Sequence, residues 1–158
     1  MLKNIIISIF FILGVLLINS ALSNQNVEEK DIINLVEKAS NYIKSNGEAA
    51  IKYIGSPDTK YYLKNKSIYV FIYDENCILL AHPYKPTLVG RSYKGKPDVR
   101  GKKFRDQIVE KALKFGQGWT DYSYQKPKVE GIFTKKVFCK LVKYNNKKYI
   151  VCAGYYLK

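Results

Sequence analysis

The sequence predicts an α+β fold in which two helices and five antiparallel strands form one domain. Apolar residues recur at three- and four-residue intervals between Asp31 and Tyr53, as they do on one face of a helix. Short runs rich in β-branched and aromatic residues, separated by polar turns, follow from Tyr69 onwards. The predicted order is a helix, two strands, a helix and three strands.

The first helix is expected over residues 31–53, where one face is apolar. Gly55-Ser56-Pro57 ends this helix, and Gly47 weakens it in the middle. Residues 58–67 are predicted to be a polar connector. The apolar positions of the helix are Ile32, Leu35, Val36, Ala39, Tyr42, Ile43, Ala50 and Tyr53.

A β-hairpin is expected after the connector. Residues 69–73 alternate aromatic side chains with Val70 and Ile72, which is typical of a strand. A polar turn at residues 74–76 leads into a second short strand over residues 78–81, which stops at Pro83.

The second half begins with a loop rich in Pro, Gly and Lys over residues 84–103. A helix over residues 104–115 should bury Ile108, Ala112 and Phe115 and should end at the glycines that follow. The remaining predicted elements are a strand over 119–124, a turn over 126–131 and a final hairpin with strands over 132–144 and 148–157.

Residues 1–23 have the layout of a secretory signal peptide. Lys3 precedes an almost wholly apolar stretch from Ile5 to Ile18, and Ala21 and Ser23 occupy the −3 and −1 positions of a cleavage site. Cleavage near Ser23 would leave residues 24–158 as a single periplasmic or secreted domain. An uncleaved membrane anchor is the open alternative, although a full span takes about 20 apolar residues.

The chain is strongly basic, with 27 Lys and Arg residues against 13 Asp and Glu residues and a net charge of +14. The basic residues are scattered in pairs such as Lys102-Lys103 and Lys135-Lys136, without a basic helix or a dense basic run. This pattern favours a solvated lysine-rich surface over nucleic-acid binding. We therefore expect no nucleic-acid partner and some attraction for small anions.

Three cysteines follow residue 23, so an oxidising compartment leaves at least one of them unpaired. Cys139 and Cys152 are symmetric about Asn145-Asn146, a candidate two-residue turn. They are either a cross-strand disulfide or two small buried apolar residues. Cys77, at the end of a predicted turn, is expected to be a free thiol.

Six motifs follow one another along the chain: Tyr69–Asp74, Ala81-His82-Pro83, Leu88-Val89-Gly90, Gly118–Tyr122, Lys135–Lys140 and Ala153-Gly154-Tyr155. In this order they resemble the second type of single Cache domain, an extracytoplasmic ligand-sensing module. The resemblance implies a long N-terminal helix followed by a PAS-like five-stranded antiparallel sheet with one intervening helix, and a ligand pocket between the sheet and the intervening loop and helix. Two positions depart from the family pattern: Cys77 replaces a turn glycine, and Phe138 replaces a tyrosine.

The resemblance implies a small organic anion of the acetate, propionate, pyruvate or lactate type as the ligand. A carboxylate that leaves water needs charged or polar donors. Lys135 would supply the charge, His82 an imidazole donor and Tyr122 a hydroxyl. Trp119 and Tyr73 would form apolar walls that limit the size of the ligand.

These assignments have structural alternatives. His82, the only histidine, could equally well cap the end of its strand through a hydrogen bond to the backbone. Alternation along a strand places Trp119 and Tyr122 on opposite faces, so that only one would face the ligand. It also separates Lys135 from Lys136, and either lysine could be the ligand-binding one. Arg91, in the loop, is a reserve candidate for binding the carboxylate.

Catalysis is not expected. Cys77 lies near His82 across the predicted hairpin, but no neighbouring group would lower the pKa of its thiol. One histidine and scattered cysteines do not have the spacing of metal ligands. We therefore expect no enzyme activity, no metal and no cofactor.

A stand-alone domain must signal by docking to another protein. The expected partner is a separate membrane receptor or histidine kinase, and the first helix is a candidate docking surface. The same helix could form a homodimer with a second copy of the chain. The alternative function is a periplasmic protein–protein docking module that has no small-molecule ligand.

Overall fold

The computed structural model describes residues 29–157 of the chain. The expected signal peptide, residues 1–23, lies outside this part. A helix over residues 29–46 precedes α2 (Glu48–Ile54). The elements that follow are β1 (Tyr62–Leu63), the 3-10 helix η1 (Lys64–Lys66), β2 (Ile68–Asp74), β3 (Leu79–Ala81), the 3-10 helix η2 (Pro86–Leu88), α3 (Phe104–Phe115), β4 (Gln117–Gln125), β5 (Ile132–Tyr144) and β6 (Lys147–Tyr156).

The strands form one antiparallel sheet in the order β1-β2-β6-β5-β4. The short β3 also pairs with β2, further along the edge that β1 occupies. β5 and β6 make the longest pairing, from Lys135 opposite Tyr156 to Tyr144 opposite Lys147. The predicted α+β fold with an antiparallel sheet and one intervening helix is therefore confirmed.

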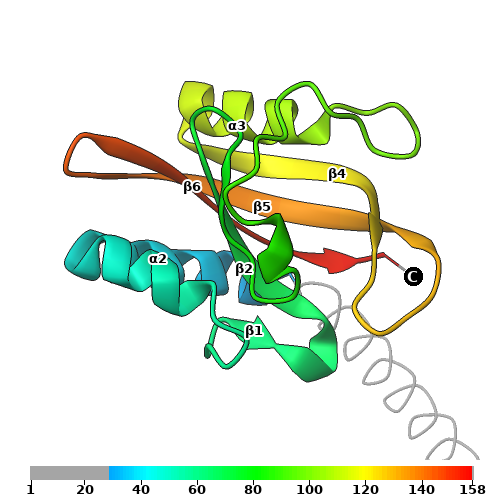
Figure 1. Ribbon diagram of the computed structural model, residues 1–158, viewed down its shortest axis with the longest axis horizontal. Helices are drawn as coiled ribbons and strands as arrows, with labels where there is room; N and C mark the ends of the chain where they lie inside the picture. The colour runs from blue at the N-terminus through cyan, green and yellow to red at the C-terminus, as the bar shows by residue number, and fades with distance from the viewer. Residues whose placement is uncertain (1–28, 158) are drawn as a thin grey trace, which may run out of the picture. The chain divides into compact units, whose positions relative to one another are not determined.

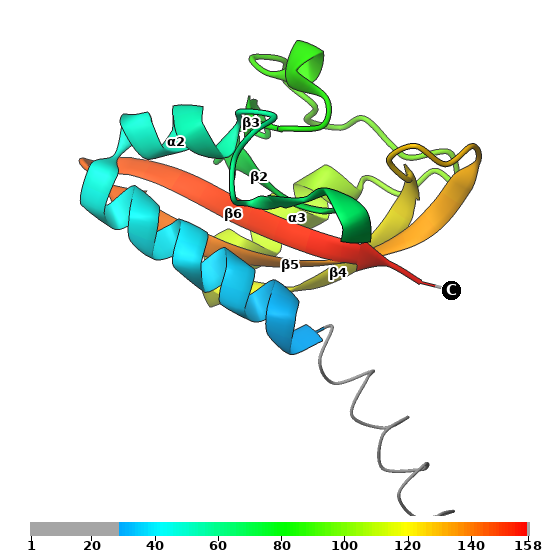
Figure 2. The same cartoon turned by 90° about the horizontal axis from the view of Figure 1, so that it is seen from below.

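Each face of the sheet packs against different elements. Residues 32–46 and α2 cover one face, which Figure 2 shows with the helix crossing β6, β5 and β4. The other face lies under α3 and the loop that precedes it (Figure 1). The alternation of β2 divides its side chains between these layers, since Val70 and Ile72 face the N-terminal helices and Tyr69, Phe71 and Tyr73 face α3.

The connector predicted over residues 58–67 contains a short strand. Tyr62 and Leu63 pair with Tyr69 and Ile68, so the sheet has six strands among the described residues. A two-residue strand has no alternation that a sequence pattern could reveal, which explains why the prediction of a connector missed it.

The single helix predicted over residues 31–53 is two helices that meet at Gly47. The backbone of Gly47 has φ 55° and ψ −130°, a conformation that a helix excludes and that side chains disfavour. A Cβ atom at this position would also collide with the ring of Tyr144 on β5. Gly47 therefore redirects the chain from the first helix into α2 and lets Tyr144 pack against the backbone.

We expect Gly47→Ala to lower the free energy of unfolding by about 2–4 kcal/mol, because it adds a steric collision to an unfavourable backbone conformation. Gly95→Ala is the matched control, since Gly95 also has a positive φ of 73° but has open space around its Cα. It should cost about 1 kcal/mol. Urea denaturation of both variants measures the difference, and equal losses would show that the Tyr144 contact contributes nothing.

The β5–β6 hairpin turns at Asn145 and Asn146, which both have positive φ, as predicted. Cys139 and Cys152 lie directly opposite each other and form a disulfide. Cys77 is a buried free thiol, and burial raises its pKa to about 11. Its φ of 60° shows that the turn has the geometry for which glycine is better suited.

Candidate functional site

Lys135 on β5 is a fully buried lysine whose ammonium nitrogen has no hydrogen-bond partner. Its Nζ lies 3.8 Å from the ring centroid of Tyr69 and 5.1 Å from that of Phe71. Tyr156 and Tyr124 follow at 5.3 and 5.9 Å. Burial lowers the pKa of Lys135 well below its usual value. We call Lys135 and these aromatic neighbours, together with His82, the Lys135 cluster.

The alternation of β5 decides which of the two adjacent lysines enters the cluster. Lys135 faces the same way as Val137 and Cys139, toward the layer that contains α3. The Nζ of Lys136 instead lies 5.2 Å from the ring of Trp119, which packs with the N-terminal helices on the other face. Only Lys135 can therefore meet a ligand held in the α3 layer.

His82, which follows β3, is 4% exposed and packs on the same aromatic rings. Its ring centroid lies 4.8 Å from that of Tyr69. The backbone N–H of Lys85 donates to His82 Nδ1 at 3.0 Å, so the neutral ring carries its proton on Nε2 and can donate a hydrogen bond. Burial first, and then the nearby charges of Lys135 and Lys85, lower the pKa of His82 to about 3.

We expect the protein to lose about 2 kcal/mol of stability between pH 7.5 and pH 5 through His82 alone. The folded-state pKa of His82 is about 3, below its usual 6.5. Between these values the unfolded chain binds the extra proton, so stability falls as the pH falls. Denaturation across this range tests the expectation. His82→Gln should flatten the dependence by that amount, and an unchanged slope would contradict it.

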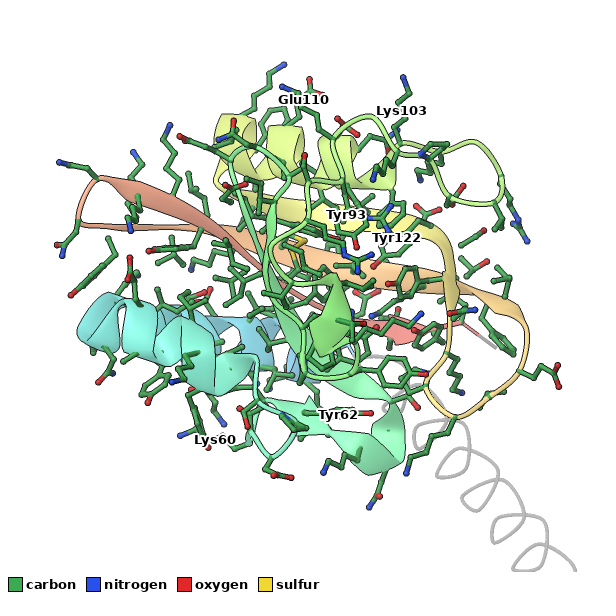
Figure 3. All side chains as sticks on the ribbon, in the orientation of Figure 1. Lys60, Tyr62, Tyr93, Lys103, Glu110 and Tyr122 are labelled. Atoms are coloured by element: carbon green, nitrogen blue, oxygen red, sulfur yellow. A yellow bond between two sulfur atoms is a disulfide. The ribbon has the colours of Figure 1, made fainter. Side chains whose placement is uncertain are left out.

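Five tyrosines of the α3 layer place their hydroxyl groups close to one another. Burial raises the pKa of each, and neighbouring tyrosines add to the rise. The hydroxyl of Tyr69 is buried and interacts with that of Tyr156. Figure 3 labels one of these tyrosines, Tyr122, in the same region of the view as Tyr93 from the loop. The five are Tyr69, Tyr73, Tyr122, Tyr124 and Tyr156.

The structure brings together four of the five predicted site residues and separates the fifth. Tyr73, His82, Tyr122 and Lys135 all belong to the α3 side of the sheet. Trp119 lies on the opposite face, with its ring 5.2 Å from that of Phe138.

Three further placements bear on the predicted site. Phe138, which departs from the family pattern, lies with Trp119, so its missing hydroxyl does not belong to the Lys135 cluster. Tyr122 stacks face to face on Phe104 of α3 at 3.7 Å, which makes it part of the layer that covers the cluster. Arg91, the reserve candidate, is exposed to solvent.

Arg105 is a charged residue of this layer that the sequence reasoning did not select. It lies in the first turn of α3, and its guanidinium carbon is 4.1 Å from the ring of Phe104 and 4.5 Å from that of Tyr93. Its Nε is buried and has no hydrogen-bond partner. A basic residue in the first turn of a helix opposes the helix dipole, which was the available signal for a special role.

The loop before α3 is fastened to its surroundings by two carboxylates. Asp98 accepts hydrogen bonds from the backbone N–H groups of Arg100, Lys102 and Ser123, the last of these on β4. Asp106 of α3 accepts from the N–H of Gly95. These bonds hold the loop over the α3 side of the sheet.

An open groove of about 1170 Å³ lies elsewhere, between α2, the β2–β3 turn and the β5–β6 turn. Two of its lysines pair with glutamates, Lys147 with Glu48 and Lys148 with Glu75. None of its lining residues belongs to the Lys135 cluster. The unpartnered buried ammonium group of Lys135, rather than the volume of this groove, locates the candidate site.

Within residues 29–157, no helix is both long and apolar enough to cross a membrane, and no group of three or more metal-binding side chains is gathered in one place. The polar groups of the Lys135 cluster that can donate to a ligand are the ammonium of Lys135 and the imidazole N–H of His82. This arrangement is suited to hold an anion.

Comparison with known proteins gives a family and a set of solved structures of the same fold. The family model for single Cache domain 2 matches residues 15–158. A Cache chemosensory domain described for carboxylic acid recognition superposes with a TM-score of 0.69 at 19% identity, covering 86% of this chain and 97% of its own. No curated protein matches the chain.

Two further solved structures come from chemotaxis proteins. A periplasmic sensor domain has a TM-score of 0.62 and 23% identity, and the match covers 85% of this chain and 92% of that one. A methyl-accepting chemotaxis protein from Vibrio parahaemolyticus has a TM-score of 0.69 and 18% identity, with coverages of 88% and 95%. At these identities the similarity establishes the fold.

Proposed function

Because the chain belongs to the single Cache domain 2 family, we propose that it is an exported sensor domain whose Lys135 cluster binds a small carboxylate. The expected ligands are of the acetate, propionate, pyruvate or lactate type. Export would follow cleavage near Ser23, with residues 24–158 as the mature domain. A sensor role agrees with the chemotaxis proteins that share the fold.

The single observation that carries this proposal is the buried ammonium group of Lys135, which has no partner. An isolated charge in an apolar environment is costly, and such a group becomes neutral unless a counter-ion accompanies it. A carboxylate among the rings of Tyr69 and Phe71 would supply that counter-ion. Binding would therefore raise the depressed pKa of Lys135 and restore its charge.

The neighbours of Lys135 supply the remaining hydrogen bonds that a carboxylate needs. His82 can donate a hydrogen bond from Nε2, because its Nδ1 already accepts one from the backbone N–H of Lys85. The hydroxyl of Tyr69, which interacts with that of Tyr156, is a further polar group beside Lys135. The buried rings of Tyr73 and Tyr122 would limit the size of the ligand, since both lie in the same layer. No group in this arrangement needs to perform a reaction.

The signal would pass to a separate membrane receptor or histidine kinase that docks on the domain. The helix over residues 29–46 remains the candidate surface for this partner or for a homodimer. Its outward residues, which include Lys38, Asn41 and Lys44, are polar and exposed. They would favour a polar, reversible interface.

A thermal shift of the purified protein against acetate, propionate, pyruvate and lactate tests the proposal. At about 100 times its dissociation constant, a ligand stabilises the native state by about 2.7 kcal/mol. We expect at least one of these acids to raise the melting temperature, and Lys135→Met to abolish the rise.

Lys136→Met is the matched control, because it removes the same charge one residue away on the opposite face of the sheet. It should keep the ligand-induced rise. If none of the acids shifts the melting temperature of a well-folded protein, the carboxylate proposal fails, and the docking module without a small-molecule ligand becomes the better account.

A further inference from the structure

The loop that leads into α3 concentrates basic residues. Residues 94–103 contain five Lys and Arg residues and one acidic residue, whereas the whole chain has 27 Lys and Arg residues among 158. The five do not follow one another directly, so the sequence shows no dense basic run, but one short loop holds them all. We call residues 94–103 the basic loop. Figure 1 shows it in light green, where it projects past the start of α3.

Most of the charge of the basic loop is directed to the solvent. Lys102 is half-buried and pairs with Asp121 on β4. Figure 3 labels Lys103, whose side chain points away from the protein. The exposed cations of the loop, which take part in none of the ion pairs of the described residues, are Lys94, Lys96, Arg100 and Lys103.

Asp98 and Asp106 hold the backbone of the basic loop instead of pairing with its cations. Asp98 accepts hydrogen bonds from the N–H groups of Arg100 and Lys102 within the loop and from that of Ser123 on β4. The carboxylate of Asp106 accepts from the N–H of Gly95 at 2.9 and 3.0 Å. The loop therefore has a fixed conformation that does not depend on a partner for its cations.

Val99 lies at the tip of the basic loop and is 71% exposed, the highest value among the large apolar side chains of the described residues. It belongs to a tight turn in which the N–H of Gly101 donates to the carbonyl of Asp98 at 3.0 Å. The nearest exposed cations along the chain are Lys96 and Arg100. An apolar tip flanked by cations is typical of segments that lie on a membrane, where the apolar group enters the headgroup region and the cations meet anionic headgroups.

We infer that the basic loop docks the domain on the surface of an anionic phospholipid bilayer, with Val99 inserted at the level of the headgroups. The tip projects from the protein, and a projecting tip can enter a soft lipid surface without a matching pocket. Docking would bring the domain to the membrane that holds the receptor or kinase of the proposed function. It uses no residue of the Lys135 cluster, so it goes beyond the carboxylate proposal and does not depend on it.

Cosedimentation of the mature domain, residues 24–158, with lipid vesicles tests the inference. These residues include every described element, and they exclude the apolar stretch from Ile5 to Ile18, which would itself bind lipid. We expect the domain to bind vesicles of phosphatidylglycerol and phosphatidylcholine in equal parts and not to bind phosphatidylcholine alone. Added salt should weaken the binding, because it screens the attraction between the loop and the headgroups.

Variants of the loop separate the contribution of the cations from that of the tip. The double variant Lys96→Gln with Arg100→Gln should lower the affinity for anionic vesicles about thirtyfold, since each cation near such a surface contributes about 1 kcal/mol. Val99→Ser should lower it about fivefold, because the inserted apolar group is lost.

The matched control removes the same charge elsewhere, with the double variant Lys52→Gln and Lys143→Gln. Both lysines are exposed and take part in none of the ion pairs of the described residues. They belong to α2 and to the part of β5 next to the β5–β6 turn, which Figures 1 and 2 show at the opposite end of the sheet from the basic loop. This variant should keep the affinity for anionic vesicles.

Each of three results would overturn the inference. The first is a folded domain that binds neither kind of vesicle, which would leave an acidic protein surface as the partner that fits the loop. The second is a control variant that weakens binding as much as the loop variant does, and the third is a Val99→Ser variant that binds as tightly as wild type. Lipid binding is measured without carboxylates, so its failure is distinguishable from failure of the proposed function. Circular dichroism establishes that each variant is folded.

Discussion

Replacing Lys135 with methionine should raise the free energy of unfolding of the ligand-free protein by about 1–4 kcal/mol. Methionine is of similar length, and its apolar side chain suits a site lined by the rings of Tyr69 and Phe71. The substitution removes a buried nitrogen that has no partner and therefore removes its desolvation cost. Urea denaturation without added carboxylate measures the gain.

The same substitution should abolish ligand binding, which separates a functional lysine from a structural one. Lys136→Met, on the opposite face, should leave ligand binding near the wild-type value. If Lys135→Met instead destabilises the ligand-free protein, the lysine contributes to the fold itself, and its burial no longer indicates a binding site.

Loss of the Cys139–Cys152 disulfide is expected to lower the free energy of unfolding by about 2–3 kcal/mol. The two residues are 13 apart in sequence, and a loop of this size loses about 3 kcal/mol of conformational entropy in the unfolded chain when it is closed. Urea denaturation with and without a reductant measures it.

Variants at the three cysteines distinguish the disulfide from simple packing. A reductant should lower the stability of wild type and of Cys77→Ala, because Cys77 is a free thiol outside the disulfide. The double variant Cys139→Ala with Cys152→Ala should not respond to it. If wild type does not respond to the reductant either, the two cysteines act only as buried apolar residues.

The sequence reveals most of the fold because its strongest patterns are long. The helix over residues 104–115 and the strand over residues 132–144 are found within the predicted bounds, since both combine a clear periodicity with glycine or asparagine at their ends. The sequence did not predict that the helical segment is divided into two helices at Gly47. Glycine within a helical pattern is tolerated in many helices, and here the contact with Tyr144 from a distant strand is specific to the tertiary structure.

The candidate site was harder to predict because residues enter it from opposite ends of the sequence. Lys135 and Lys136 differ only by strand alternation, and the face that each takes depends on the register of β5 with β4 and β6. The same alternation moves Trp119 away from Tyr122. Arg105 could not be recognised from its own helix as a member of the α3 layer, because the rings that surround it include Tyr93 from the preceding loop.

Isothermal titration calorimetry of the wild-type protein and of Lys135→Met with short carboxylates tests the central claim most directly, because it measures binding without relying on a change in stability. A carboxylate that binds wild type with saturable one-to-one stoichiometry, binds Lys136→Met equally well and does not bind Lys135→Met is the predicted result. Absence of binding to wild type, or equal binding to Lys135→Met, would contradict the assignment of the Lys135 cluster as the ligand site.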